Sequence, residues 1–126
     1  MGITMANLVL TNPKRGDLKP VSVRALADTG SVHLCIPESV MKILELEIID
    51  KRPVILADDS IIHVPYAGPI MTCFENRVGF TGALVMGNTV LLGAIPMEDM
   101  DLIVVPRTCK VVVNPESPEV ASSIAK

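Results

Sequence analysis

Short apolar segments alternate along the chain with turns rich in proline, glycine, asparagine and aspartate. In one segment Val21 and Val23 are apolar while Ser22 and Arg24 are polar, which is the period-two pattern of a half-buried β-strand. Short β-branched segments between such breakers are typical of all-β proteins. We therefore predict strands over residues 3–10, 20–27, 32–36, 52–57, 60–73, 78–86, 89–93, 102–105 and 110–113.

The segments between these strands predict turns and two short helices. Pro37 is expected to open a helix whose Val40, Met41 and Leu44 share one face, which is best explained as core packing. Pro96 is expected to start the second helix. Further turns are predicted at residues 12–17, 75–76 and 87–88, and a hairpin is predicted with Asp58 and Asp59 at its tip.

Length and composition predict one domain. A chain of 126 residues can bury a core without disulfides or metals, and 49% of its residues are hydrophobic while only 2% are aromatic. The core must therefore consist of aliphatic side chains. We place the domain at residues 1–114, followed by a C-terminal tail at 115–126 that contains two prolines and small polar residues.

Charge and hydropathy narrow the classes of partner. The net charge is −3, no basic stripe is present and only three residues are aromatic, which argues against nucleic-acid binding. No apolar run reaches the length of about 20 residues that a membrane span needs. The N-terminus lacks the pattern of a signal peptide, so the expected location is cytoplasmic.

The cysteines and histidines do not suggest a metal site. Cys35, Cys73 and Cys109 are far apart and odd in number, so reduced thiols are expected rather than a disulfide framework. His33 and Cys35 could supply two ligands, but no second pair follows them. We therefore expect no metal and no cofactor, with His33 packed or exposed as an ordinary imidazole.

The segment on which the other elements depend is Asp28-Thr29-Gly30-Ser31. An apolar run ends there abruptly, and apolar residues resume with Val32. Gly30 frees the backbone for a tight turn between two strands. A carboxylate in such apolar surroundings is costly unless it is hydrogen-bonded, shared with another group or functional.

Three features, taken in order, resemble the retropepsin-like aspartic proteases, and among them the small microbial single-domain members. An apolar strand leads into Asp28-Thr29-Gly30-Ser31, Ile36-Pro37 follows at a short distance, and Leu91-Leu92-Gly93 precedes the second helix. The resemblance covers residues 3–114. It implies an all-β fold, a closed barrel that forms half of an acid protease and contains one or two short helices, and assembly as a homodimer.

The resemblance also implies a role for each residue of this loop. Asp28 is the catalytic carboxylate, and one from each subunit would act on a shared water molecule. Thr29 would donate a hydrogen bond across the subunit axis, Gly30 would contact the peptide backbone, and the Ser31 hydroxyl could bond the outer oxygen of the carboxylate. Leu92-Gly93 would pack beside the loop, although a plain strand ending explains these two residues without any special role.

The predicted hairpin resembles the flap that closes over substrate in this family. Its tip comprises Ala57, Asp58, Asp59 and Ser60, with Asp59 where relatives usually carry glycine. An ordinary surface hairpin explains the same residues equally well. If the hairpin is a flap, Asp59 stiffens the turn and adds negative charge above an acidic site.

The resemblance thus implies an aspartic endopeptidase whose partners are a second copy of the chain and a peptide or protein substrate. The alternative is a non-catalytic module that uses the same scaffold for dimerisation or peptide binding, because a fold does not fix a function. The apolar strands near the two chain ends, 3–10 and 110–113, could pair between subunits or within one chain.

Overall fold

The computed structural model describes residues 3–125. Within this part of the chain, nine strands and two six-residue helices confirm the all-β class. The elements follow in the order β1 (Met5–Thr11), β2 (Val21–Ala27), β3 (Leu34–Ile36), α1 (Glu38–Ile43), β4 (Glu47–Ile55), β5 (Ile61–Phe74), β6 (Arg77–Val85), β7 (Leu91–Leu92), α2 (Ala94–Asp99), β8 (Leu102–Val105) and β9 (Lys110–Val113).

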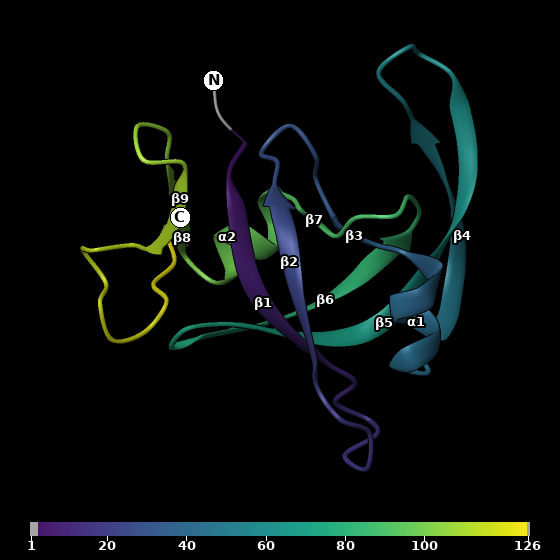
Figure 1. The fold of residues 1–126 in the computed structure, drawn as a ribbon, viewed down its shortest axis with the longest axis horizontal. Helices are drawn as coiled ribbons and strands as arrows, with labels where there is room; N and C mark the ends of the chain where they lie inside the picture. Colours follow the sequence, from purple (N-terminus) through teal and green to yellow (C-terminus); the bar gives the residue numbers. More distant parts are fainter. Residues whose placement is uncertain (1–2, 126) are drawn as a thin grey trace.

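Six of the strands close into a barrel (Figure 1). Their hydrogen-bonded order is β5, β6, β3, β7, β2 and β1, and β1 returns to β5 through the pairs Val9↔Cys73 and Thr11↔Met71. Outside this ring, β4 extends β5 on one side, while β9 and β8 follow β1 on the other. Closure pairs the backbone groups of the ring strands, so the unpaired edges lie on β4 and β8.

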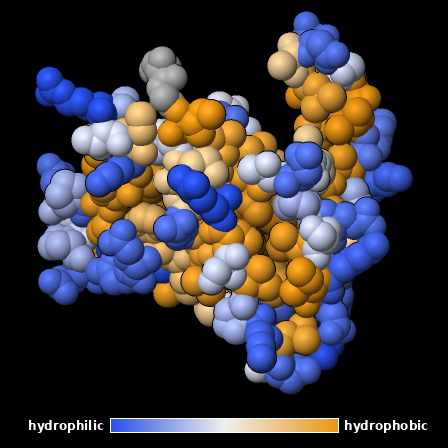
Figure 2. All heavy atoms as spheres, viewed as in Figure 1, coloured by the Kyte–Doolittle hydropathy of each residue, from blue (hydrophilic) through white to orange (hydrophobic). Residues whose placement is uncertain are grey.

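Aliphatic side chains fill the barrel, as the composition predicts. Leu8, Leu10, Leu34, Ile36 and Leu92 come from three different strands, and each is at most 1% exposed. Figure 2 shows that apolar side chains also reach the surface along the β4–β5 hairpin, below a hydrophilic tip. The core therefore continues into an apolar surface beside this hairpin.

Several predicted boundaries differ from those in the structure, and two of the differences have a clear physical cause. The strand expected to begin at residue 52 begins at Glu47, because the long strand β5 offers pairing partners as far as Gly68. Ile48 and Ile49 are both about 60% exposed, so this half of β4 lacks the alternation that identifies a half-buried strand. The helix expected to start at Pro96 starts at Ala94.

The two helix starts follow from backbone hydrogen bonding. Pro37 is the extended N-cap residue of α1, which confirms that it opens this helix. In α2 the N-cap is Gly93, and Pro96 lies within the first turn. The N–H groups of a first turn have no partner within the helix, so proline is tolerated anywhere in it.

The strands near the two chain ends pair within one chain. β1 lies antiparallel to β2 and meets β9 in a parallel pairing at Met5↔Lys110. β9 forms a hairpin with β8. Of the two arrangements that the sequence allows, the structure shows pairing within one chain for β1 and β9. Ile3 precedes β1 and is 74% exposed.

Residues 115–125 have no regular secondary structure, but hydrogen bonds hold residues 117–122 against the rest of the chain. Asn76 donates its side-chain amide to the carbonyl of Pro118 at 2.8 Å, and the backbone N–H of Ser122 donates to the Asp101 carboxylate at 3.1 Å. Beneath this segment Arg77 is 1% exposed and donates from Nη2 to the carbonyl of Ser117. The segment thus covers the turn between β5 and β6.

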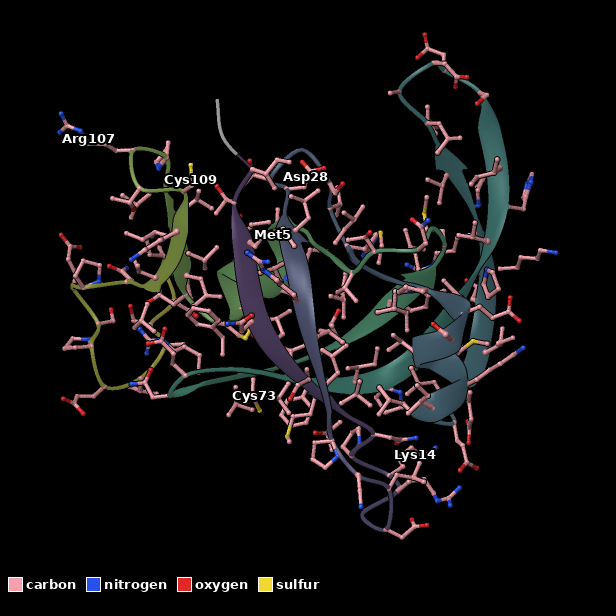
Figure 3. The ribbon with its side chains drawn as sticks, in the orientation of Figure 1. Met5, Lys14, Asp28, Cys73, Arg107 and Cys109 are labelled. Carbon is pink, nitrogen blue, oxygen red and sulfur yellow. The ribbon has the colours of Figure 1, made fainter. Side chains whose placement is uncertain are left out.

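Two further expectations concern the cysteines and membrane-spanning segments. Cys35, Cys73 and Cys109 are free cysteines, and Figure 3 shows Cys73 and Cys109 on separate parts of the molecule. In residues 3–125, neither short helix has the length and apolar character needed to cross a bilayer.

Candidate active site

Asp28 directly follows the last residue of strand β2 and lies at one end of the barrel, as Figure 3 shows. The preceding residues Leu26 and Ala27 pair in parallel with Leu91 and Leu92 of β7. The backbone N–H of Asp28 then donates to the carbonyl of Leu92 at 3.0 Å. The carboxylate is therefore anchored by two neighbouring strands at the point where β2 ends.

The loop itself orients both carboxylate oxygens of Asp28. The backbone N–H of Gly30 donates to Oδ1 at 3.0 Å, and the hydroxyl of Ser31 donates to Oδ2 at 3.2 Å. The Ser31 contact is the one that the family resemblance suggests. Because these two donors belong to the same tight turn, the carboxylate is held at one orientation while remaining half-buried.

The segment after β7 braces the loop from behind. The N–H groups of Ala94 and Ile95 donate to the carbonyls of Ser31 and Val32 at 2.8 and 2.9 Å. A Cβ atom at Gly93 would lie 2.3 Å from the carbonyl oxygen of His33, so no larger residue fits without moving the backbone. The structure thus brings Leu92 and Gly93 against the Asp28 loop, where the resemblance expects them.

Thr29 lies on the exposed outer side of the loop. Together with Asp28, Thr29 borders a cavity of about 430 Å³ whose other walls include Ile3, Val104 and Pro106. Within residues 3–125, the Thr29 hydroxyl makes no hydrogen bond, unlike the Gly30 N–H and the Ser31 hydroxyl of the same loop. The predicted bond across a subunit axis therefore stays a prediction.

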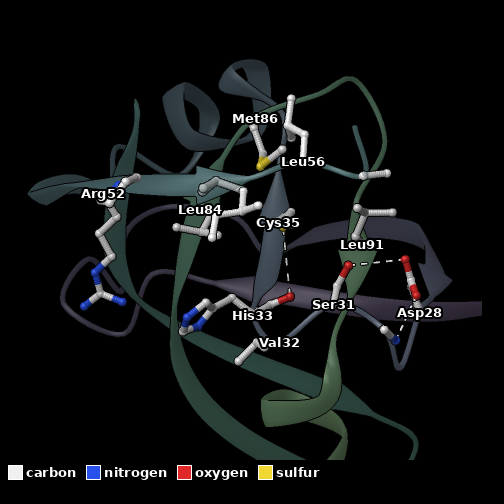
Figure 4. A pocket seen from close by; sticks show the side chains of 15 residues that line it. Asp28, Ser31, Val32, His33, Cys35, Arg52, Leu56, Leu84, Met86 and Leu91 are labelled. Atoms are coloured by element: carbon white, nitrogen blue, oxygen red, sulfur yellow. Dashed lines mark hydrogen bonds between the residues drawn. The ribbon is translucent and has the colours of Figure 1, made fainter. Parts of the chain in front are cut away.

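The other side of Asp28 faces a cavity of about 670 Å³ between the loop and the β4–β5 hairpin (Figure 4). Asp28 and Ser31 stand at one side of it, and Arg52 stands at the other. Apolar residues make up most of the lining between them: Val32, Cys35, Pro53, Val54, Ile55, Leu56, Ala57, Leu84, Met86 and Leu91. The site is an apolar groove with a carboxylate at one end.

The hairpin predicted as a flap projects from the barrel beside this cavity (Figure 1). Ala57 lines the cavity, whereas Asp58, Asp59 and Ser60 form the tip beyond it. Asp59 adopts a left-handed backbone with φ of 66°, a conformation that aspartate tolerates better than most residues. Hydrogen bonds from Ser60 hold the pKa of the Asp58 carboxyl below its ordinary value of 3.8.

Sequence reasoning missed a cluster of three side chains at the far end of the cavity. The Arg52 guanidinium lies 3.6 Å from the centre of the Tyr66 ring, and the His33 ring meets Tyr66 edge-on at 6.0 Å. Burial, and to a smaller extent the nearby charge of Arg52, lower the pKa of His33. Alternation along β4, which puts Arg52, Val54 and Leu56 on one face, could have pointed to this cluster.

Cys35 is the other reactive side chain in the cavity. It is 5% exposed and its Sγ faces the carbonyl of His33 at 4.0 Å. Burial, with a smaller effect from the charge of Asp28, raises the pKa of this thiol, so it stays protonated and a poor nucleophile. Within residues 3–125, three or more histidine, cysteine or acidic side chains do not gather in a cluster that could hold a metal ion.

Comparisons with known proteins identify the fold. No protein-family model matches the chain, and no curated protein matches its sequence. Among solved structures it is similar to the retroviral protease-like domain of Ddi1 from Leishmania major, with a TM-score of 0.56 and 10% identity over 90% of this chain and 91% of that one. A protein of unknown function from Legionella pneumophila, Lpg0085, matches with a TM-score of 0.39 and 11% identity over 77% of this chain and 84% of that one. The similarity to the Ddi1 domain shows that this chain has the retropepsin-like fold.

Proposed function

We propose that the chain is an aspartic endopeptidase whose active site forms when two copies associate. The observation that carries this proposal is the Asp28 loop. It presents a half-buried carboxylate, oriented by the Gly30 N–H and the Ser31 hydroxyl, to an apolar groove beside a projecting hairpin. The retropepsin-like fold supports the proposal, but fold alone does not establish chemistry.

The chemistry depends on bringing two such carboxylates together. At a separation of about 4 Å, two charges repel by about 4 kcal/mol at an effective dielectric constant of 20. A pair this close holds one proton between its members rather than ionising twice. The ionised member can take a proton from a bound water molecule, while the protonated member polarises the carbonyl of the peptide bond.

A homodimer supplies the second carboxylate, because one chain carries a single Asp-Thr-Gly sequence. A two-fold axis close to Thr29 would place both Asp28 side chains at one interface. The exposed Thr29 hydroxyl, the exposed Ile3 and the neighbouring Val104 and Pro106 would then be covered by the second copy. This assembly completes the site and hides apolar surface in one step.

The substrate is proposed to be an extended peptide that lies in the groove beneath the hairpin. The edge of β4 offers backbone hydrogen-bonding groups to such a peptide, in the manner of an added strand. The aliphatic lining favours apolar side chains next to the scissile bond.

The test compares wild-type protein with Asp28→Asn on a peptide library between pH 4 and pH 7. Asp17→Asn is the matched control, since Asp17 pairs with Arg15 on an exposed loop. We expect cleavage by wild type and by the control, no cleavage by Asp28→Asn, and less cleavage as rising pH removes the shared proton. Equal cleavage by all three would exclude Asp28 as the catalyst, and peptide binding without cleavage by wild type would indicate a binding module.

A further inference from the structure

The guanidinium of Arg52 stacks on the aromatic ring of Tyr66. The Arg52 Cζ lies 3.6 Å from the centre of the Tyr66 ring, a distance typical of a cation–π contact. Tyr66 also packs closely on Gly82, where an added Cβ would lie 2.3 Å from the ring. Gly82 thus leaves room for the ring, and the ring gives Arg52 a fixed platform at the end of the groove.

Arg52 is the only lysine or arginine among the described residues that line the cavity. Its ion pair with Asp50 joins Nε to Oδ2 at 3.6 Å, and its side chain is 39% exposed. This contact involves Nε of the guanidinium, so the two terminal nitrogens, Nη1 and Nη2, can donate to another acceptor. Such a fork matches the geometry of a carboxylate.

The groove therefore has opposite charges at its two ends. Asp28 stands at one end and Arg52 at the other, with Leu84, Cys35 and Leu91 between them (Figure 4). Near Arg52, the lowered pKa of His33 favours the neutral imidazole at pH 7, so the positive charge at this end belongs to Arg52 at that pH. A ligand that fits is apolar near Asp28 and anionic near Arg52.

We propose that Arg52 is a specificity-determining residue that binds the carboxylate of an aspartate or glutamate side chain in an extended peptide. The inference rests on the proposed function, and it adds the substrate class: peptides with apolar residues at the scissile bond and an acidic residue at a distance from it. In a two-fold dimer, one Arg52 lies at each end of the joined groove. An acidic side chain of the peptide can bind the Arg52 at either end of the joined groove, whereas the peptide's C-terminal carboxylate can reach only one of them. We therefore assign the bound carboxylate to a side chain.

The test measures binding rather than cleavage, on the full-length Asp28→Asn protein, by fluorescence anisotropy of labelled peptides. Each peptide has an apolar centre, and glutamate, glutamine or lysine is placed at each flanking position in turn. Every peptide is made with a free and with an amidated C-terminus. At low ionic strength we expect glutamate at one position to strengthen binding by about five- to tenfold over glutamine, irrespective of amidation.

Three substitutions in this background identify the responsible side chain. Arg52→Gln should abolish the preference for glutamate, and Arg52→Glu should replace it with a preference for lysine. Lys51→Gln is the matched control, because Lys51 is the adjacent exposed cation and does not line the cavity. It should leave the preference unchanged.

A preference that survives Arg52→Gln, one that needs a free C-terminus, or a complete lack of peptide binding would each overturn the inference. Cleavage of neutral peptides by the wild-type protein, with no preference for glutamate, would reject the Arg52 subsite and leave the endopeptidase proposal intact. Arg52-dependent selection of glutamate without cleavage by wild type would support the subsite and count against the endopeptidase.

Discussion

At Gly93 a missing side chain lets two backbone segments approach closely enough to hold the Asp28 loop. An added Cβ would lie 2.3 Å from the His33 carbonyl oxygen and 2.8 Å from that of Ser31, and backbone atoms cannot swing aside as side chains do. We expect Gly93→Ala to lower the free energy of unfolding by about 1–3 kcal/mol, the usual cost of overpacking. Urea denaturation monitored by circular dichroism measures the loss.

Gly16→Ala is the control for this substitution. Gly16 lies in an exposed loop, and a Cβ there would meet nothing within 4 Å. Its free energy of unfolding should change by less than about 0.5 kcal/mol. Equal losses in the two variants would show that the close approach at Gly93 is not what stabilises the loop.

The carboxylate of Asp58 provides a prediction about pH. The Ser60 hydroxyl and N–H donate to Asp58 Oδ1 and lower its pKa below 3.8. Because the folded pKa is depressed, these bonds stabilise the turn above the ordinary pKa and are lost as pH falls through the folded value. We expect the hairpin tip to stay intact at pH 4–7 and to loosen only in stronger acid.

A titration of the Asp58 side chain followed by NMR tests this. Ser60→Ala removes the hydroxyl donor but keeps the backbone N–H, so the Asp58 pKa should rise and still lie below its ordinary value. The neighbouring variant Asp59→Asn is the control and should leave the titration nearly unchanged. If the Asp58 curve is the same in wild type and Ser60→Ala, the hydroxyl has no part in the shift.

At the scale of single residues, the sequence predicts the Asp28 turn but not the Arg52 cluster. Asp28, Gly30 and Ser31 are neighbours in the chain, so local turn chemistry indicates them. Arg52 and Tyr66 are brought together by the β4–β5 register, in which Arg52 pairs with Val64. A register between two strands is not readable from either strand alone.

At the scale of elements, strands with one buried face are well predicted and the others are not. β2 and β6 have such alternation, whereas the first half of β4 is exposed on both faces, and β7 has only two residues. The predicted start of α2 is wrong because proline is accepted throughout a first turn and so does not mark its first residue. Hydrophobic periodicity therefore locates the elements whose burial alternates regularly. The boundaries of the other elements depend on pairing between distant strands.

The hairpin tip is an element that can be shortened without touching the barrel. The Leu56 N–H donates to the carbonyl of Ser60, and Val54↔Ile62 is the next hydrogen-bonded pair along the ladder, so a two-residue Asn-Gly turn can replace residues 55–61 in the same register. We expect the free energy of unfolding to change by less than about 1 kcal/mol, because the replaced residues lie outside the main core cluster. Peptide binding should weaken at least about tenfold if the hairpin covers the ligand.

Anisotropy with labelled peptides and urea denaturation measure these two effects. The double variant Asp58→Asn, Asp59→Asn serves as the control, because it keeps the length of the tip and removes its charge. It should bind neutral peptides as wild type does. Unchanged binding by the shortened hairpin would favour an ordinary surface hairpin over a flap.

At the scale of the whole molecule, closure of the barrel depends on contacts between distant parts of the chain. β1 reaches β5 through Val9↔Cys73, and β2 reaches β7 through Leu26↔Leu91. No local pattern encodes such pairings, and only the resemblance carried by the order of the motifs implied a closed barrel. The association of two chains is encoded even less by local sequence patterns, so the proposed dimer needs a separate test.

Mixing subunits tests whether one site is shared by two chains. When wild type is mixed with an equal amount of Asp28→Asn and the subunits exchange freely, about a quarter of the dimers carry two aspartates. Peptide cleavage per wild-type subunit should then fall to about half, since each mixed dimer has a single Asp28 and cannot share a proton between two. An equal amount of an unrelated inert protein should cause no loss. Full activity after exchange, confirmed with differently labelled subunits, would mean that each chain holds a complete site and that the proposed dyad does not exist.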